Sequence, residues 1–211
     1  MRRSRIQQRS VYAGAQINRL TADWITSLMS ADQELRGDLR KLRERSRELV
    51  RDHPFATQFL RLLRNNIPGP TGIRLQAQVR DERGDLQRDL NREIEGGWRE
   101  WGRRGTPTVD GRYSFPGLER LCIGLLAMDG EYLLRRHLVP TEQNPFAYAL
   151  QVLDPDQLDE TYNRPPDAQG VRISMGVEQD SFGRPLVYHL FARHPRDTYA
   201  GGLRERTPVP A

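Results

Sequence analysis

Residues 171–191 read VRISMGVEQDSFGRPLVYHLF, and this stretch decides the fold class. Apolar and polar residues alternate over residues 171–177, which is the two-residue period of a half-buried strand. Residues 186–191 form a second run that is rich in strand-favouring residue types. Between the runs, Asp180 and Gly183 are residue types that turns use. The stretch predicts a β-hairpin, and because two strands alone are only marginally stable, the hairpin must pack on other elements.

Four upstream segments carry the three- and four-residue apolar spacing of amphipathic helices. Proline at position 54 removes an amide donor and separates the first two segments. Ser114 is a favourable N-cap for the last segment, which is also the most apolar, and Asp129-Gly130 ends it. The predicted helices span residues 31–51, 55–67, 86–102 and 115–128.

Further strands are predicted on both sides of the last helix. Residues 73–79 alternate as a short strand, and residues 131–139 and 147–153 form two more strand-like runs ahead of the hairpin. Helices followed by an antiparallel meander indicate an α+β fold rather than an alternating α/β fold. The expected organisation is a basic extended arm at 1–29, an α+β domain at 30–199 and an irregular end at 200–211.

The positive charge of the chain belongs to its N-terminal part. Residues 1–51 have a net charge of +6, while the remainder has −1, and Lys41 is the only lysine in the sequence. Such an arm binds polyanions, binds a charged partner surface, or is a frayed tail with no specific partner. The arginines of the helix at 31–51 form either a solvated face or a nucleic-acid-binding face.

No segment is apolar and long enough to span a membrane, and the one cysteine excludes an internal disulfide. Cys122 lies on an apolar helix face, which predicts a buried, inert thiol rather than a nucleophile.

Known catalytic and cofactor motifs are absent from the sequence. It has no glycine-rich phosphate-binding loop, and none of its four histidines has a Cys or His partner at metal-ligand spacing. His189 lies on a predicted strand and is interpreted as a packed or surface residue. Asp129 and Glu131 resemble a carboxylate pair, but at a helix-to-strand junction they are interpreted as turn residues. We therefore predict no enzyme, cofactor or metal, and we assign no catalytic residue.

A series of short motifs resembles the lambda-type phage portal proteins, the head–tail connectors through which DNA enters and leaves the capsid. Each motif is weak alone, but together they follow the order of that family over about residues 12–195. The motifs are Tyr12-x-Gly14-Ala15, Arg19-Leu20-Thr21-x-x-Trp24, Ser30-Ala31-Asp32, Leu42-Arg43-x-Arg45-Ser46-Arg47-x-Leu49-Val50-Arg51-Asp52, Pro54-Phe55-Ala56, Asn65-Asn66-Ile67-x-Gly69, Gly72-Ile73-x-Leu75-Gln76, Trp98-x-x-Trp101, Asp129-Gly130-Glu131, Gly176-Val177-Glu178-x-Asp180 and Gly183-Arg184-Pro185-x-x-Tyr188-His189.

The sequence also departs from the family pattern. Pro68 and Pro70 are additional within the Asn-Asn-Ile segment, and a cysteine usual near Asp110 is missing. Family members are about twice as long or longer, so the resemblance implies an N-terminal, wing-like part of a portal protein.

The resemblance implies a structural subunit rather than an enzyme. Portal proteins assemble as a closed ring of about twelve copies at one capsid vertex, with head-to-tail contacts. Their partners are the terminase large subunit, capsid proteins, head–tail adaptors and the double-stranded DNA that passes through. The implied location is the virion, with the host cytoplasm during assembly. DNA sliding requires diffuse electrostatics, so no DNA-contacting residue is assigned. The alternative is a stand-alone nucleic-acid-binding protein that uses residues 1–51.

Overall fold

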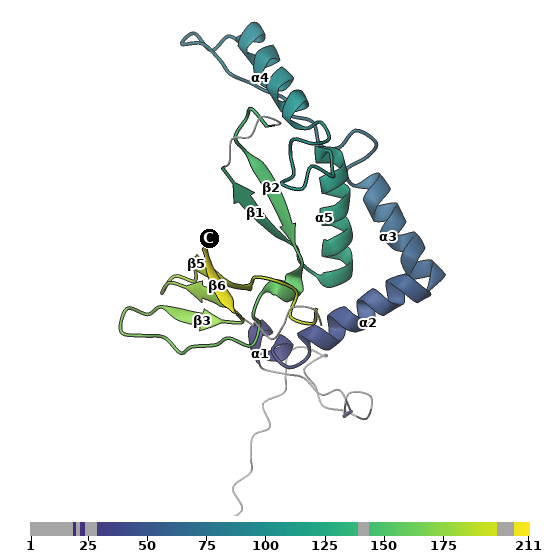
Figure 1. The fold of residues 1–211 in the computed structure, drawn as a ribbon, viewed down its shortest axis with the longest axis vertical. Helices are drawn as coiled ribbons and strands as arrows, with labels where there is room; N and C mark the ends of the chain where they lie inside the picture. The colour runs from purple at the N-terminus through teal and green to yellow at the C-terminus, as the bar shows by residue number, and fades with distance from the viewer. Residues whose placement is uncertain (1–18, 20–21, 24–28, 139–143, 198–204) are drawn as a thin grey trace, which may run out of the picture.

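Helices come first along the chain and antiparallel strands follow, which confirms the α+β class (Figure 1). The structure, a computed structural model, describes residues 19, 22–23, 29–138, 144–197 and 205–211. The expected basic arm at 1–29 lies almost entirely outside the described residues. The helices are α1 (Ala31–Leu35), α2 (Leu39–Asp52), α3 (Pro54–Asn66), α4 (Arg88–Trp101) and α5 (Phe115–Asp129).

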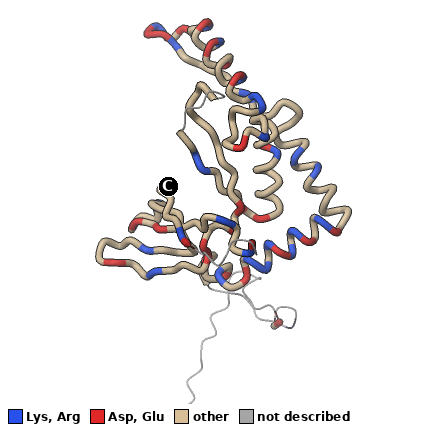
Figure 2. The backbone as a smooth tube through the Cα atoms, in the orientation of Figure 1, with Lys and Arg blue, Asp and Glu red and all other residues tan. Residues whose placement is uncertain are grey.

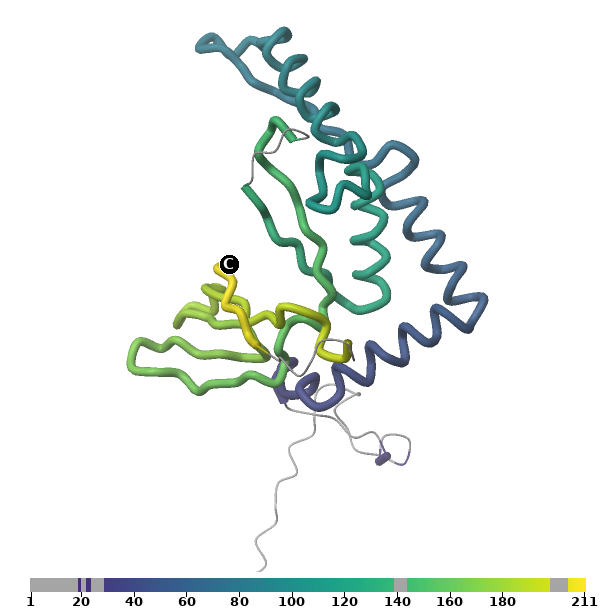
Figure 3. Tube along the Cα trace, in the orientation of Figure 1, coloured from purple at the N-terminus to yellow at the C-terminus, as the bar shows by residue number. Residues whose placement is uncertain are grey.

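The first predicted helix is divided into two. It was expected to run through residues 31–51, but α1 ends at Leu35 and α2 begins at Leu39. Gly37 lies in the break, where glycine costs about 1 kcal/mol relative to alanine in a helix interior. The predicted interruption at Pro54 is confirmed: His53 is extended, and α3 leaves α2 at a sharp bend (Figure 3).

Helix α5 carries the hydrophobic core. Its N-cap, Ser114, accepts a hydrogen bond from the amide of Gly117, and Gly130 ends the helix with φ 82°. The buried core residues are Trp101, Leu118, Cys122 and Leu150. The indole Nε1 of Trp101 donates to the main-chain O of Tyr148 at 2.9 Å, which satisfies its only polar group.

The strands form two antiparallel sheets. Strand β1 (Leu133–His137) pairs with β2 (Ala149–Leu153), and β2 packs against α5 through Leu150. A four-stranded sheet has the order β3-β4-β5-β6, and a 3₁₀ turn, η2 (Pro155–Gln157), leads toward it from β2. Its strands are β3 (Arg172–Ser174), β4 (Val177–Gln179), β5 (Pro185–Phe191) and β6 (Arg206–Pro210).

The predicted hairpin of residues 171–191 contains three strands instead of two. Its first run is interrupted at Met175 and Gly176, which have φ values of 48° and 82° and form a two-residue turn between Ser174 and Val177. Hairpin turns of this type require positive φ at both central residues. The apolar alternation continues across the turn, so periodicity alone did not indicate it.

Two other predictions about strands were wrong. Residues 73–79 are extended but pair with no strand of the described chain, and helix α4 lies beside them instead. The end expected to be irregular, residues 200–211, contains β6, which pairs with β5 from Phe191 to Val187. Prolines at positions 208 and 210 argue against a strand when only the sequence is considered. Proline is tolerated in a strand mainly at a sheet edge, and β6 is an edge strand.

The turn at Gly176 gives a direct test of the sheet geometry. A Cβ at this position would lie 2.6 Å from the main-chain O of Asp159, while a Cβ on Gly183 meets no atom within 4 Å. Both glycines have positive φ, so Gly183→Ala should cost only backbone strain of about 1–2 kcal/mol. We expect Gly176→Ala to lower the free energy of unfolding clearly further in urea titrations. Equal losses for the two variants would contradict this packing.

Candidate functional site

Helix α2 presents two arginines to carboxylates that come from much later in the chain. Arg43 and Arg47 are four residues apart and therefore lie on one face of α2. Figure 2 shows basic and acidic positions interleaved along this helix. We call the two arginines and the five carboxylates that they contact the arginine–carboxylate cluster; the carboxylates are Asp129, Glu131, Asp154, Asp156 and Glu160.

Arg47 makes the closest set of contacts. Its Nε and Nη2 donate to the two carboxylate oxygens of Asp129 at 2.6 and 3.1 Å, the two-pronged geometry that makes such pairs strong. Its Nη1 donates to Asp156 at 2.7 Å, and Nη2 also reaches Asp154 at 3.2 Å. The side chain of Asp129 is only 1% exposed, so Arg47 supplies the charge that this buried carboxylate needs.

Arg43 is the more buried arginine, at 4% exposure. Its Nη1 donates to Glu160 at 3.3 Å and to Asp156 at 3.4 Å, and its Nη2 contacts Glu131. Together the two guanidinium groups join α2 to the end of α5 and to the η2 turn.

Two members of the cluster, Arg47 and Asp156, have pKa values shifted in the directions that keep them charged. The hydrogen bond to Asp129 raises the pKa of Arg47, although burial opposes this. Burial raises the pKa of Asp156, but the charge and hydrogen bonds of Arg47 outweigh it and leave that pKa lowered. The ion pair between Arg47 and Asp156 therefore stays charged near neutral pH.

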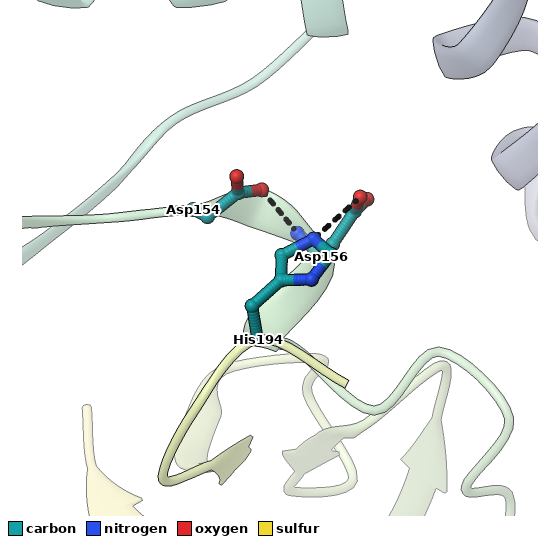
Figure 4. Close-up of side chains that lie close together, drawn as sticks. All are labelled: Asp154, Asp156 and His194. Atoms are coloured by element: carbon teal, nitrogen blue, oxygen red, sulfur yellow. Dashed lines mark hydrogen bonds and ion pairs between the residues drawn. The ribbon is translucent and has the colours of Figure 1, made fainter. Parts of the chain in front are cut away.

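Part of the cluster has the composition of a cation site. Asp154, Asp156 and His194 bring one possible ligand atom each to within 4.8 Å of one another (Figure 4). However, the guanidinium of Arg47 already contacts both carboxylates, and Asp154 also accepts from the amide of Asp156. The residues therefore bind a guanidinium, and a metal ion at the same carboxylates would meet its positive charge.

The described chain also exposes large apolar side chains on one face of α3. Phe55, Phe59 and Leu62 follow the i, i+4, i+7 spacing and are 82%, 59% and 48% exposed. The opposite face of α3 buries Leu60. Exposed apolar stripes of this kind mark protein–protein contacts.

Comparison with known proteins identifies the family. A sequence model of the phage portal proteins, lambda family, matches residues 18–211. A protein of Halomonas phage phiHAP-1, named "Probable portal protein", is 36% identical over 187 residues, which cover 88% of this chain and 36% of that protein.

The chain belongs to the lambda family of phage portal proteins. This confirms the family indicated by the sequence motifs and supports a structural role at the portal. The chain spans only 36% of the length of the relative that it matches. Among its described residues, no helix is both long and apolar enough to cross a membrane.

The structure shows the surroundings of Cys122, His189, Asp129 and Glu131. Cys122 is buried, and burial raises the pKa of its thiol to about 11, which confirms an inert cysteine. His189 packs edge-on against Tyr162 with ring centroids 4.9 Å apart, as a packed residue. Asp129 and Glu131 flank Gly130 at the end of α5, as predicted, but their carboxylates also bind arginines of α2, which the sequence did not indicate.

Neither interpretation of the α2 arginines describes Arg43 and Arg47, whose guanidinium groups are paired with carboxylates of the same chain. A signal for this was present in the sequence. Arg43 follows Leu39 by four residues and Arg47 precedes Val50 by three, so both lie beside the apolar stripe. The acidic partners, more than eighty residues away, could not be assigned from spacing.

Replacing Arg47 tests the cluster. Arg47→Met keeps much of the apolar stem but leaves the buried Asp129 carboxylate unpaired, so we expect a loss of about 3–5 kcal/mol in the free energy of unfolding. Arg45→Met, at an exposed position of the same helix, should change it by less than about 0.5 kcal/mol. Urea unfolding measures both values, and similar effects from the two substitutions would contradict the role of Arg47.

The lowered pKa of Asp156 predicts a pH dependence. A carboxylate whose folded pKa lies below its unfolded value of about 3.9 stabilises the fold above that pH, and the contribution is lost as pH falls through the folded pKa. We therefore expect the stability difference between the parent chain and Asp156→Asn to be largest near pH 7 and to shrink below about pH 4. A difference that stays constant with pH would contradict the ionised pair.

Proposed function

We propose that this chain is the N-terminal part of a subunit of a phage portal ring. The ring forms the passage for double-stranded DNA at one capsid vertex, and it binds the packaging terminase and the head–tail adaptors. Copies of the subunit, about twelve, associate head to tail and close by rotation. The protein is located in the virion, after assembly in the host cytoplasm, and its role is structural rather than enzymatic.

The observation that carries this proposal is the family match over nearly the whole chain. The physical features of the fold support it. The described chain has few buried apolar residues and many large exposed ones, including the stripe on α3. A single copy therefore leaves apolar surface in water, which lateral contacts between subunits would cover.

The alternative of a stand-alone nucleic-acid-binding protein loses much of its basis in α2. Arg43 and Arg47 are neutralised inside the fold, and Arg40 contacts Glu160 at 3.4 Å. The helix also carries Glu44 and Glu48 on its exposed surface. Phosphate binding requires arginines that are free to replace counterions, and α2 offers few of them.

Ring formation can be tested by substitution in the exposed apolar stripe on α3, which consists of Phe55, Phe59 and Leu62. In the full-length protein, we expect Phe55→Asp and Phe59→Asp to abolish ring formation, because each places a charge in an apolar contact. Both side chains are largely exposed in the single copy, so the unfolding midpoint should stay close to that of the parent. Electron microscopy and sedimentation velocity report ring formation.

Arg61→Gln is the matched control, because it changes the net charge by the same amount at an exposed position of α3 outside the stripe. Rings should form normally with this variant. Failure of the parent protein to form rings under any assembly condition would contradict the proposed function, and normal rings from both Phe variants would exclude the α3 stripe as a contact.

A further inference from the structure

Residues 72–79 are held in an extended conformation by side chains from two helices. The amide of Ile73 donates to both carboxylate oxygens of Glu119 on α5, at 3.1 and 3.2 Å. The amide of Ala77 donates to Glu95 at 3.1 Å. Asn91 forms two bonds with the main chain of Val79, as acceptor at 2.8 Å and donor at 3.2 Å. Helix side chains thus occupy the place that a neighbouring strand would have.

This anchoring leaves the opposite edge free. In an extended chain, successive residues direct their main-chain polar groups to alternate edges, so the bonded residues 73, 77 and 79 share one edge. Arg74, Gln76 and Gln78 therefore direct their N–H and C=O groups to the other edge. These groups have no hydrogen-bond partner within the part of the chain that the structure describes.

Further contacts anchor the start of the segment. Arg120 on α5 donates to the carbonyls of Gly69 and Pro70 at 2.8 Å, just before the extended stretch begins. Gly72 has φ 73°, and a Cβ there would lie 2.2 Å from the carboxylate of Glu119. Burial raises the pKa of Glu119, and the hydrogen bond from Ile73 opposes this shift.

The same segment also exposes apolar side chains. Ile73 and Leu75 are 68% and 40% exposed, and a groove of about 510 Å³ next to them is lined by Trp98 and Phe115. An exposed apolar edge with free main-chain groups is a template for a strand of another molecule. Helix α4 and the extended segment beside it project from the rest of the described chain (Figure 1).

Most other edges among the described residues are closed. The outer edge of β3 is covered at Arg164, which exchanges two main-chain hydrogen bonds with Ile173. The outer edge of β2 is covered where Leu150 bonds to Pro107 and Val109.

The outer edge of β6 is closed in a different way. The amide of Ala211 donates to the main-chain O of Leu186 on β5, so the main-chain groups of residues 208 and 210 point to the other side, away from β5. Both residues are prolines, whose nitrogens carry no proton, so this outer edge offers no N–H at these two positions. The outer edge of β1, residues 133–137, has no such cover within the described chain.

We propose that the free edge of residues 74–78 pairs with the outer edge of β1 in a second copy of this chain. The pairing joins two different surfaces, which is what a head-to-tail ring contact requires. This inference rests on the proposed function and specifies one contact of that ring. The side chains of Arg74, Arg135 and Arg136 are exposed. Side chains of a strand project from its two faces rather than from its edges, so these arginines leave the main-chain edges accessible.

Hydrogen exchange of the full-length protein, read at single-residue resolution by mass spectrometry, tests the pairing. In the unassembled subunit, the amides of Arg74, Gln76 and Gln78 should exchange freely, while those of Ala77 and Val79 are already protected. In the ring, we expect the free-edge amides to exchange at least about tenfold more slowly, together with the outward amides of β1. Rings in which either edge still exchanges freely would overturn the pairing and leave the proposed function intact.

A proline substitution gives a second, independent readout. Gln76→Pro removes an N–H that has no partner within the subunit, so the unfolding midpoint should stay close to that of the parent, while ring formation is lost. Gln76→Ala removes only the side chain and should form rings normally. Normal rings from a folded Gln76→Pro variant would overturn the inference. If the parent itself forms no rings, both the proposed function and this inference fail.

Discussion

The ion pair between Arg47 and Asp129 is the interaction on which the arrangement of this subunit depends. It connects α2, near the start of the described chain, with the end of α5, and the same guanidinium continues to Asp154 and Asp156 beside η2. The carboxylate of Asp129 is buried, so its charge requires this partner. Helix α5 also carries the hydrophobic core, and both α2 and α3 pack directly on it, so the pair and this packing together place α2 and α3 relative to the core.

This fixed frame has a consequence for function. The core of the described chain is small, and helix α3 exposes apolar residues such as Phe55 and Phe59 instead of burying them. Such a subunit gains stability when its exposed faces are covered by neighbours. Charge and apolar surface are thus separated in the described chain: the arginines of α2 bind carboxylates inside the fold, while the apolar stripe of α3 and the edge of residues 74–78 stay exposed.

Local signals in the sequence predicted local structure well. Ser114 and Gly130 define the ends of α5, and Pro54 separates α2 from α3, because capping and proline effects act over a few residues. Features that depend on distant partners were missed. The Arg47–Asp129 pair joins residues 82 positions apart, and residues 73–79 alternate like a strand although helix side chains bind them. Strand β6 was hidden by its prolines, and its pairing with β5 is visible only in three dimensions.

The most direct test of the account is a cryo-electron microscopy reconstruction of the full-length protein after assembly. We expect a closed ring with an axial passage, in which Arg47 contacts Asp129 within each subunit and the α3 stripe lies at a boundary between subunits. A protein that remains monomeric, or a ring in which Phe55 and Phe59 face solvent and Arg47 has left Asp129, would contradict it.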